Sequence, residues 1–350
     1  MSLGFRAVQW NREKIVYDAI LLGAVAVYIG FFLGIVTGLD KPKTFLDWID
    51  IPIRAFGSCA FIMLTIVLAI GPLARIDRRF LPLLYNRRHF GVLTFIVAAV
   101  HASWMVEWYA AQNALPNIIA ELTKWTDYAK FIGFPFKTLG LTALVVLFLM
   151  AATSHDFWLV VLTPRVWKSL HMAVYVAYAL VVMHVALGYL QDDRTPVTIG
   201  MLIVGFGSVA ALHLVAGSRE RTRDRGVAPG KDGWLPVGPA AAIPDKAALI
   251  VAAPGGERIA VFRDGAQIGA LTNLCAHQEG PLGEGRIIDG FITCPWHGYQ
   301  YRLADGCAPP PFPDKLATYR VRLRDGVVEV DPHPLPPGTP AAITCPPQTL

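Results

Sequence analysis

The sequence has little charge for its length, and this shortage is the first observation that restricts the class of protein. Only 16% of its 350 residues are charged, whereas 54% are hydrophobic and the mean hydropathy is +0.45. Soluble globular proteins average about 25% charged and about 45–50% apolar residues. The apolar excess ends near residue 218, after which the composition is that of an ordinary soluble domain. We therefore expect a membrane part followed by a water-soluble part, and the abundant apolar residues exclude a wholly disordered chain.

Disulfide frameworks and nucleotide sites are also missing. The five cysteines are odd in number and unevenly spaced, which does not fit a set of structural disulfides. There is no G-x-G-x-x-G after a predicted strand, no P-loop, no G-x-S-x-G and no H-E-x-x-H. These absences exclude a flavin or pyridine-nucleotide reductase region and the common hydrolase sites. The net charge of +5 arises from short basic clusters between apolar runs, so we expect no nucleic-acid partner.

Six uncharged stretches are long enough to cross a bilayer, for which about 17–25 mainly apolar residues are needed. They are Ala19–Leu39, Ala55–Ala74, Phe90–Val106, Thr138–Ser154, Ser169–Leu190 and Thr195–Ser218. The first follows three basic residues, as in a signal peptide, but its apolar run is too long and no small-residue cleavage site follows. We expect a retained helix there, and an all-α bundle of six membrane helices over residues 1–218.

The distribution of Lys and Arg predicts the orientation of this bundle. With the N-terminus inside, the inner segments carry three, five, two and four basic residues, fourteen in all. The outer loops then carry three, three and one, seven in all. Because basic residues are enriched on the cytoplasmic side, both termini are expected in the cytoplasm, with the chain in a bacterial-type inner membrane in contact with lipid.

Three histidines lie inside the predicted membrane helices, His101 in the third and His171 and His184 in the fifth. Ionisable residues within a bilayer are costly and are usually functional, although a neutral histidine bonded to a neighbouring helix is the structural alternative. Paired imidazoles are suited to bind heme as a one-electron carrier. His171 and His184 are 13 residues apart, hence about 19–20 Å along an ideal helix, and cannot bind one iron. If both are ligands, two hemes at different depths are implied, and the sequence leaves the number at one or two.

Depth suggests how these histidines pair. The third and fifth helices run in the same direction, and His101 and His184 lie about 16 and 22 Å from the starts of their segments. They are predicted to bind an outer heme. His171 lies near the inner face and needs another partner. His89, at the start of the third helix, is the first candidate; His213 in the sixth helix competes with it, and His155 is a weaker alternative that resembles a loop residue.

Two short motifs around these histidines carry a family resemblance. Arg87-Arg88-His89-Phe90-Gly91 with the later His101, and Trp167-Lys168-Ser169-Leu170-His171 with the later His184, resemble the ferric-reductase-like transmembrane family. Within that family the sequence is most similar to MsrQ-type subunits, the heme-binding membrane partners of a periplasmic methionine sulfoxide reductase. The resemblance covers about residues 15–217. It implies a six-helix bundle with b-type heme and places His101, His171 and His184 at ligand positions, whereas His89 is not carried over.

The chain beyond residue 218 shows β patterns. A basic, Gly-containing linker over 219–232 precedes a stretch with four Asp-Gly pairs, several flanked by alternating apolar residues, which indicates hairpins. The pattern predicts a small all-β domain over 233–332. The remainder, 333–350, is Pro-rich and is expected to be a disordered tail.

The most specific motif of the chain lies in this β domain. Cys275-Ala276-His277 is followed after sixteen residues by Cys294-Pro295-Trp296-His297. Two cysteines and two histidines can bind zinc, which is the simpler interpretation. The spacing, with glycines between the halves, resembles a Rieske [2Fe-2S] domain. That resemblance implies that Cys275 and Cys294 hold the inner iron and His277 and His297 the outer one, on loops at hairpin tips.

The motif departs from the Rieske proteins of cytochrome bc complexes in two places. Their loop-linking disulfide is replaced here by Gly280 and Trp296, and their serine near the cluster by Tyr299. The domain therefore resembles the ferredoxin and oxygenase type. With fewer hydrogen bonds to sulfur, we expect a potential toward the low end of the Rieske range. Cys307 and Cys345 are interpreted as non-ligands.

Together these patterns predict one-electron carriers without a substrate site, since no part of the chain remains for a catalytic iron domain. We expect a membrane protein that passes electrons from a soluble cytoplasmic donor or quinol, through the cluster and heme, to a periplasmic reductase or other acceptor. Whether it is itself an enzyme is left open. The alternatives are a self-contained reductase of ferric chelates or oxygen, and a non-redox membrane protein that binds zinc at the Cys and His site.

Overall fold

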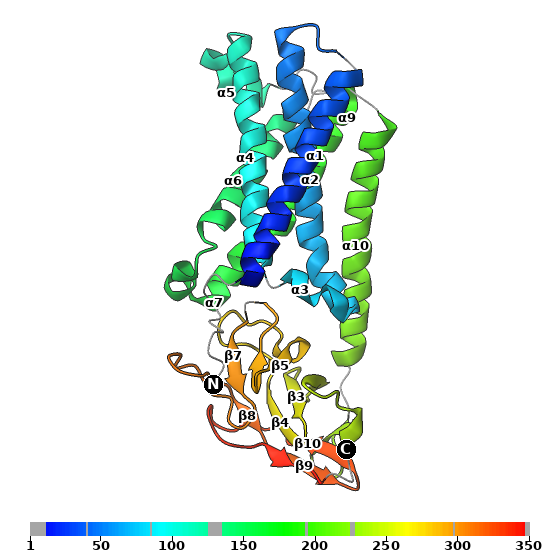
Figure 1. The fold of residues 1–350 in the computed structure, drawn as a ribbon, viewed down its shortest axis with the longest axis vertical. Coiled ribbons are helices and arrows are strands. Elements are labelled where there is room, and N and C mark those ends of the chain that lie inside the picture. Colours follow the sequence, from blue (N-terminus) through cyan, green and yellow to red (C-terminus); the bar gives the residue numbers. More distant parts are fainter. Residues whose placement is uncertain are drawn as a thin grey trace. The chain divides into compact units, whose positions relative to one another are not determined.

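The computed structural model describes most of the chain. The described residues are 12–39, 41–84, 86–124, 135–192, 195–224, 228–296 and 298–346. They form two compact units, each considered by itself: Arg12–Gly71 with Arg87–His213, and Pro72–Asn86 with the chain from Leu214 onward. Figure 1 shows long helices in the first unit and the strands in the second.

All six predicted membrane stretches are helical. The long helices are α1 (Arg12–Leu39), α2 (Phe45–Ile76), α4 (Arg87–Ala111), α6 (Phe136–Ala152), α7 (Asp156–Met172) with α8 (Val174–Leu187), and α10 (Pro196–Asp224). Short elements join them: η1 (Arg78–Phe80), α3 (Leu81–Leu84), η2 (Leu115–Asn117), α5 (Ile118–Thr123) and α9 (Tyr189–Asp192). Within the described residues, five helices are long and apolar enough to cross a membrane, and α6 is a shorter apolar helix of 17 residues. The predicted fold class is confirmed, with α6 at the lower limit of spanning length.

The helices of the first unit pack around a small central core. Phe61 and Leu64 of α2 contact Leu147 of α6, Tyr178 of α8 and Val209 of α10. Large apolar side chains on the outer helix faces remain exposed, which suits a surface that lipid covers. The bundle thus buries its interior against itself while leaving its outer faces apolar.

The second unit is an all-β domain with helix ends attached. Its strands are β1 (Leu235–Pro239), β2 (Ala247–Ala252), β3 (Arg258–Asp264), β4 (Gln267–Thr272), β5 (Arg286–Ile288), β6 (Phe291–Thr293), β7 (Gln300–Arg302), β8 (Thr318–Tyr319), β9 (Val321–Arg324), β10 (Val327–Val330) and β11 (Ile343–Thr344). They form three antiparallel sheets, in the orders β1-β10-β9, β11-β4-β3-β2 with β8 also on β4, and β5-β6-β7.

Three of the four Asp-Gly pairs lie at two-residue hairpins, as the sequence predicts, although in the first the two loop residues are Gly265 and Ala266. They join β3 to β4, β5 to β6 and β9 to β10. At Asp289-Gly290 and Asp325-Gly326 both residues have positive φ, the conformation that a tight hairpin of right-handed twist requires. Asp305-Gly306 instead ends a turn after β7, where the Asp305 carboxylate accepts hydrogen bonds from Arg302 and from the Cys307 amide.

The ends of the predicted soluble region differ from the sequence expectation. The linker expected over 219–232 begins as helix, because α10 continues to Asp224. The tail expected to be disordered is ordered as far as residue 346. Its strand β11 pairs with β4, the amide of Ala341 donates to Ala304, and Cys345 is 2% exposed in the core. The prediction of disorder relied on the proline content of this segment and was wrong. These residues form few ladder hydrogen bonds and are ordered by burial instead.

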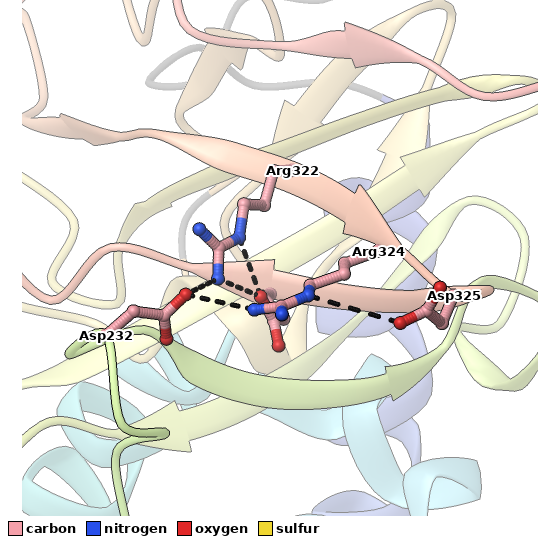
Figure 2. Close-up of polar contacts among 5 residues, drawn as sticks. Asp232, Arg322, Arg324 and Asp325 are labelled. Atoms are coloured by element: carbon pink, nitrogen blue, oxygen red, sulfur yellow. Dashed lines mark hydrogen bonds and ion pairs between the residues drawn. The ribbon is translucent and has the colours of Figure 1, made fainter.

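A polar network fixes the chain where it enters this domain. Figure 2 shows Asp232 between the guanidinium groups of Arg322 and Arg324 on β9. Arg322 also donates to Glu329 on β10 at 2.6 Å, and its guanidinium lies over the Trp234 ring at 4.2 Å. Isolated surface ion pairs contribute little to stability. Here several charged groups share their contacts and one guanidinium also lies over an aromatic ring, so the network contributes more than an isolated pair. It joins the start of the domain to the β9–β10 hairpin.

Candidate functional site

Two of the predicted membrane histidines face each other. The imidazoles of His101 on α4 and His184 on α8 have ring centres 6.5 Å apart, with planes at 80°. Nδ1 of His101 lies 2.9 Å from the carbonyl oxygen of Ile53, and Nδ1 of His184 lies 2.8 Å from that of Phe136. Because a carbonyl oxygen only accepts, Nδ1 carries the proton in both rings. The Nε2 atoms therefore keep their lone pairs, as in histidines that bind metals.

The spacing of the two rings fits one metal ion between them. With metal–imidazole bonds of about 2.1 Å and about 1.1 Å from each nitrogen to its ring centre, two rings on opposite sides of one ion have centres roughly 6.4 Å apart. The observed separation of His101 and His184 is 6.5 Å. The two imidazoles could thus hold one heme iron between them.

Two glycines make room for these imidazoles. A Cβ built on Gly57 of α2 would lie 3.0 Å from the His101 ring, and one on Gly140 of α6 would lie 2.8 Å from the His184 ring. Real Cβ atoms essentially never approach that closely, so a larger residue at Gly140 would displace the imidazole. The sequence analysis missed both positions, since their role depends on which helices pair.

A large apolar cavity adjoins the two histidines. Its volume is about 1070 Å³, and its wall includes Phe61, Leu64, Leu144 and Val181 besides the imidazoles. Pockets for drug-sized ligands occupy about 300–1,000 Å³, so a porphyrin-sized group fits. The described residues therefore satisfy the chemical and spatial requirements of a heme site.

His171 has the features of a ligand without a visible partner. Its Nδ1 lies 2.9 Å from the Trp167 carbonyl oxygen, and the Trp167 ring stacks on the imidazole at 3.8 Å. Its Nε2 is buried and has no hydrogen-bond partner among the described residues. Buried polar atoms are normally satisfied, and an orphaned one calls for an explanation such as an absent ion or ligand.

The three candidate partners of His171 differ in the contacts that their imidazole rings make. His89 Nδ1 lies 2.7 Å from the Asp18 carboxylate. In His213 both ring nitrogens are engaged, with the Val209 carbonyl and the Tyr175 hydroxyl, which argues against metal binding. His155 caps the start of α7 by accepting the amide of Phe157, in agreement with a loop role.

The predicted cluster loops of the second unit are tight and closed by backbone hydrogen bonds. In the first, which follows β4, the Cys275 amide donates to the Gly280 carbonyl at 2.9 Å. In the second, between β6 and β7, the Cys294 amide donates to the Tyr299 carbonyl at 2.8 Å. Cys275 and Cys294 are each 2% exposed, whereas His297 lies outside the described residues.

The sulfur of Cys275 lies in an environment that stabilises negative charge. A hydrogen bond with the Cys294 thiol lowers the pKa of Cys275, and bonds from the Tyr301 hydroxyl and from the amides of His277 and Gln278 act in the same direction against the effect of burial. The Tyr301 oxygen lies 3.4 Å from Cys275 Sγ. The two thiols are thus brought together and prepared to bind metal as thiolates.

Aromatic side chains support the rest of the loops. The His277 ring stacks on Tyr299 with centres 5.2 Å apart and planes 7° apart, and the Tyr299 hydroxyl donates to Asp314. A Cβ on Gly280 would lie 3.0 Å from Cys294 Sγ and 3.1 Å from the Trp296 ring. The Trp296 ring therefore packs directly against Gly280, at the two positions that form a disulfide in the Rieske proteins of bc complexes.

All five cysteines are described, and all five are free thiols. Cys275 and Cys294 belong to one core cluster of the β domain. Cys345 belongs to the other core cluster, and Cys307 is half-buried beside Asp305. This separation favours the interpretation of Cys307 and Cys345 as non-ligands.

Comparisons with known proteins show the families of both parts of the chain. The family model described as "Ferric reductase like transmembrane component" matches residues 55–182. The heme-binding subunit MsrQ of the protein-methionine-sulfoxide reductase of Caulobacter vibrioides is 32% identical over 159 residues, which cover 45% of this chain and 69% of that subunit. The MsrQ of Brucella anthropi is 31% identical over 207 residues, covering 58% of this chain and 82% of that protein.

The C-terminal part matches a second family. The model described as "Rieske [2Fe-2S] domain" matches residues 233–320. The ferredoxin subunit of anthranilate 1,2-dioxygenase from Burkholderia cepacia is 39% identical over 80 residues, covering 22% of this chain and 72% of that subunit. The chain is an MsrQ homologue of the ferric reductase like family with a C-terminal Rieske domain. Both resemblances inferred from the short motifs are thereby confirmed.

The MsrQ-like part and the Rieske domain also contain functional residues that the motifs do not reveal. The hydroxyl of Tyr301 contacts Cys275, a predicted cluster ligand. Its place four residues after His297 was the available signal. Gly57 and Gly140 each follow, by one helical turn, the residue whose carbonyl accepts a histidine Nδ1–H, Ile53 and Phe136. This position indicates a role only once it is known which helices pack against each other.

Proposed function

We propose that this membrane electron-transfer protein passes single electrons between a cytoplasmic [2Fe-2S] cluster and heme held by intramembrane histidines. The observation that carries the proposal is the His101 and His184 pair, set at the spacing of two imidazoles on one iron beside a porphyrin-sized cavity. The same chain carries a Rieske domain. Rieske clusters and bis-imidazole hemes each exchange one electron, so the two centres are chemically matched.

In the Rieske domain, Cys275 and Cys294 would hold the inner iron and His277 and His297 the outer one. The paired burial of the two thiols and the stacking of His277 on Tyr299 support this assignment. When bound, the cluster supplies a one-electron acceptor whose outer histidines are the route of electron exchange. The loops hold it through backbone amides and the Tyr301 hydroxyl.

In the MsrQ-like part, His101 and His184 would hold an outer b-type heme, and His171 with His89 an inner one. The buried, orphaned Nε2 of His171 supports the second site. The contact of His89 with Asp18 supports His89 over His213, because carboxylates commonly orient metal-binding histidines through the other ring nitrogen.

We infer that electrons enter from a soluble cytoplasmic donor or from quinol and leave toward the periplasm of a bacterium. The excess of basic residues on one side supports cytoplasmic termini. The relatives named as subunits of a protein-methionine-sulfoxide reductase support a partner reductase as acceptor.

Membranes containing the full chain test this proposal. After complete reduction we expect the α-band of low-spin b-type heme together with the EPR signal of a reduced Rieske cluster. His184→Ala should lose the outer heme and keep the cluster signal, because the residue lies in the other compact unit. His155→Ala, which alters only a helix cap, is the matched control and should keep both signals.

Two results would overturn the proposal. One is a cluster that its donor reduces without any electron reaching heme. The other is purified protein that contains zinc and neither iron nor porphyrin, which would favour the zinc-binding alternative.

A further inference from the structure

A short pattern occurs twice in the MsrQ-like part, once beside each facing histidine. The segments are Ile53–Gly57, with sequence IRAFG, and Phe136–Gly140, with sequence FKTLG. In each, the carbonyl of the first residue accepts the Nδ1–H of His101 or His184, and the glycine four residues later packs on the same imidazole. In each, the second residue is basic. The repeat therefore places one basic residue next to each carbonyl group that accepts the Nδ1–H of a facing histidine.

Both basic residues line the cavity that adjoins the histidines. Arg54 of α2 and Lys137 of α6 belong to its wall. Arg54 makes a long ion pair with Asp50, at 3.7 Å, in which both side chains are more than one-third exposed. Lys137 Nζ lies 5.0 Å from the centre of the Tyr109 ring and 5.8 Å from that of Trp108. Asp50 belongs to the same wall, which is otherwise mainly apolar, so Arg54 and Lys137 leave a net positive charge at the cavity edge.

The wall also contains a buried hydroxyl without a hydrogen-bond partner in the part of the chain that the structure describes. Tyr109 is 3% exposed, and its hydroxyl is buried without a hydrogen-bond partner among the described residues. Buried hydroxyls normally have a hydrogen-bond partner, so an unsatisfied one calls for an explanation. The Lys137 ammonium lies over the ring of the same tyrosine, so this end of the cavity favours a ligand group that accepts hydrogen bonds and carries negative charge.

We propose that Arg54 and Lys137 each bind one of the two carboxylates of the porphyrin whose iron His101 and His184 hold, with Tyr109 donating to the carboxylate at Lys137. The inference rests on the proposed function, and it orients the cofactor. The acidic edge of the porphyrin points toward the end of the bundle where α6 begins, and the apolar edge points into the core. Charge-assisted hydrogen bonds to carboxylates are among the strongest in proteins. The two basic residues therefore favour one orientation of the porphyrin over the others.

Porphyrin esterification provides the test. The full chain, produced in heme-deficient cells, is titrated with hemin and with its dimethyl ester, in the wild type and in Arg54→Met, Lys137→Met and Tyr109→Phe. For the wild type we expect the ester to bind about tenfold or more weakly, since a lost charge-assisted bond is worth about 1.5–3 kcal/mol. Each Met variant should weaken hemin binding and reduce the effect of esterification, and Tyr109→Phe should do so more weakly.

The controls keep the two proposals distinguishable. Lys124→Met alters a basic residue at the end of α5 that is paired with Glu121 and does not line the cavity, and it should bind hemin like the wild type. Monodisperse elution in size-exclusion chromatography reports that the membrane helices of each variant are folded, because the Rieske EPR signal comes from the other compact unit. Bis-imidazole heme that binds equally well as acid or ester, in all variants, overturns this inference and leaves the proposed function intact. That result would fit cations that bind lipid headgroup phosphates. Absence of bis-imidazole heme in the wild type overturns the proposed function itself.

Discussion

At the scale of single residues, Tyr301 connects the protein fold to the chemistry of the cluster. It is fully buried, and its hydroxyl accepts the Ala276 amide at 3.1 Å while lying 3.4 Å from Cys275 Sγ. Burial, and then the neighbouring Cys275, raise the pKa of Tyr301, so the hydroxyl stays protonated and can donate to sulfur. The sequence comparison with bc-complex proteins counts only the lost serine, whereas the structure shows that one sulfur contact is retained.

Tyr301→Phe should lower the reduction potential of the cluster. A hydrogen bond to sulfur stabilises the more negative, reduced form, and removing a bond worth about 0.5–1.5 kcal/mol lowers a one-electron potential by about 20–65 mV. The measurement is an EPR-monitored redox titration of the full chain. Tyr319→Phe is the control, because its hydroxyl donates to Glu257 in the other core cluster of the domain. Equal shifts in the two variants would show that the sulfur contact has no specific effect.

At the scale of elements, the heme site depends on how closely helices approach. Each predicted ligand histidine is held between its own helix and a neighbour, His101 by α2 and His184 by α6. Glycine at the contact allows the imidazole ring to lie against the neighbouring backbone. The cost of glycine within a helix, about 0.5–1 kcal/mol relative to alanine, is therefore explained by function at Gly57 and Gly140.

Gly140→Ala should cause loss of most of the outer heme. Its Cβ would lie 2.8 Å from the His184 ring, so the imidazole must move off the Phe136 carbonyl and out of line with His101. The heme-to-protein ratio of the purified chain, measured by absorbance, should fall several-fold. Gly91→Ala on α4 is the matched control, since a Cβ there meets nothing within 4 Å. A normal heme ratio in Gly140→Ala would contradict the assigned role of this glycine.

The elements also show what the sequence could reveal about the site. Helical rise alone placed His101 and His184 at similar depths, and the rings are indeed adjacent. Rise along one helix says nothing about the neighbour that faces it, so the carbonyl anchors and the packing glycines could not be predicted. His213 remained a competitor for the same reason, until its contacts with Val209 and Tyr175 were known.

At the scale of the whole molecule, the division into membrane and soluble parts was predictable because hydropathy and turn signals are local. The order within residues 333–346 was not, because β11 forms only by pairing with β4, about 75 positions earlier in the chain. Local composition identifies a segment that is poor in helix and strand formers. It does not reveal an exposed strand edge elsewhere that will pair with that segment.

Reporter fusions test the expected orientation of the molecule. Fluorescent protein fused after Asp224, at the end of α10, should fluoresce, and alkaline phosphatase at the same place should be inactive, because that end is expected in the cytoplasm. Fusions after Asn113, between α4 and α5, should give the opposite pair of results. Active phosphatase after Asp224 would reverse the orientation, and with it the side on which the cluster accepts electrons.

The contact of Trp296 with Gly280 has a consequence for how the two loops are joined. A covalent bridge between the two loops would have to be oxidised into place, and thiol reductants could cut it. Here a ring pressed on a glycine backbone takes that position, and the five thiols stay free. This contact is noncovalent, so thermal motion alone can break and restore it. No oxidase or isomerase is therefore needed to join the loops, which suits the reducing cytoplasm in which the domain is expected to lie.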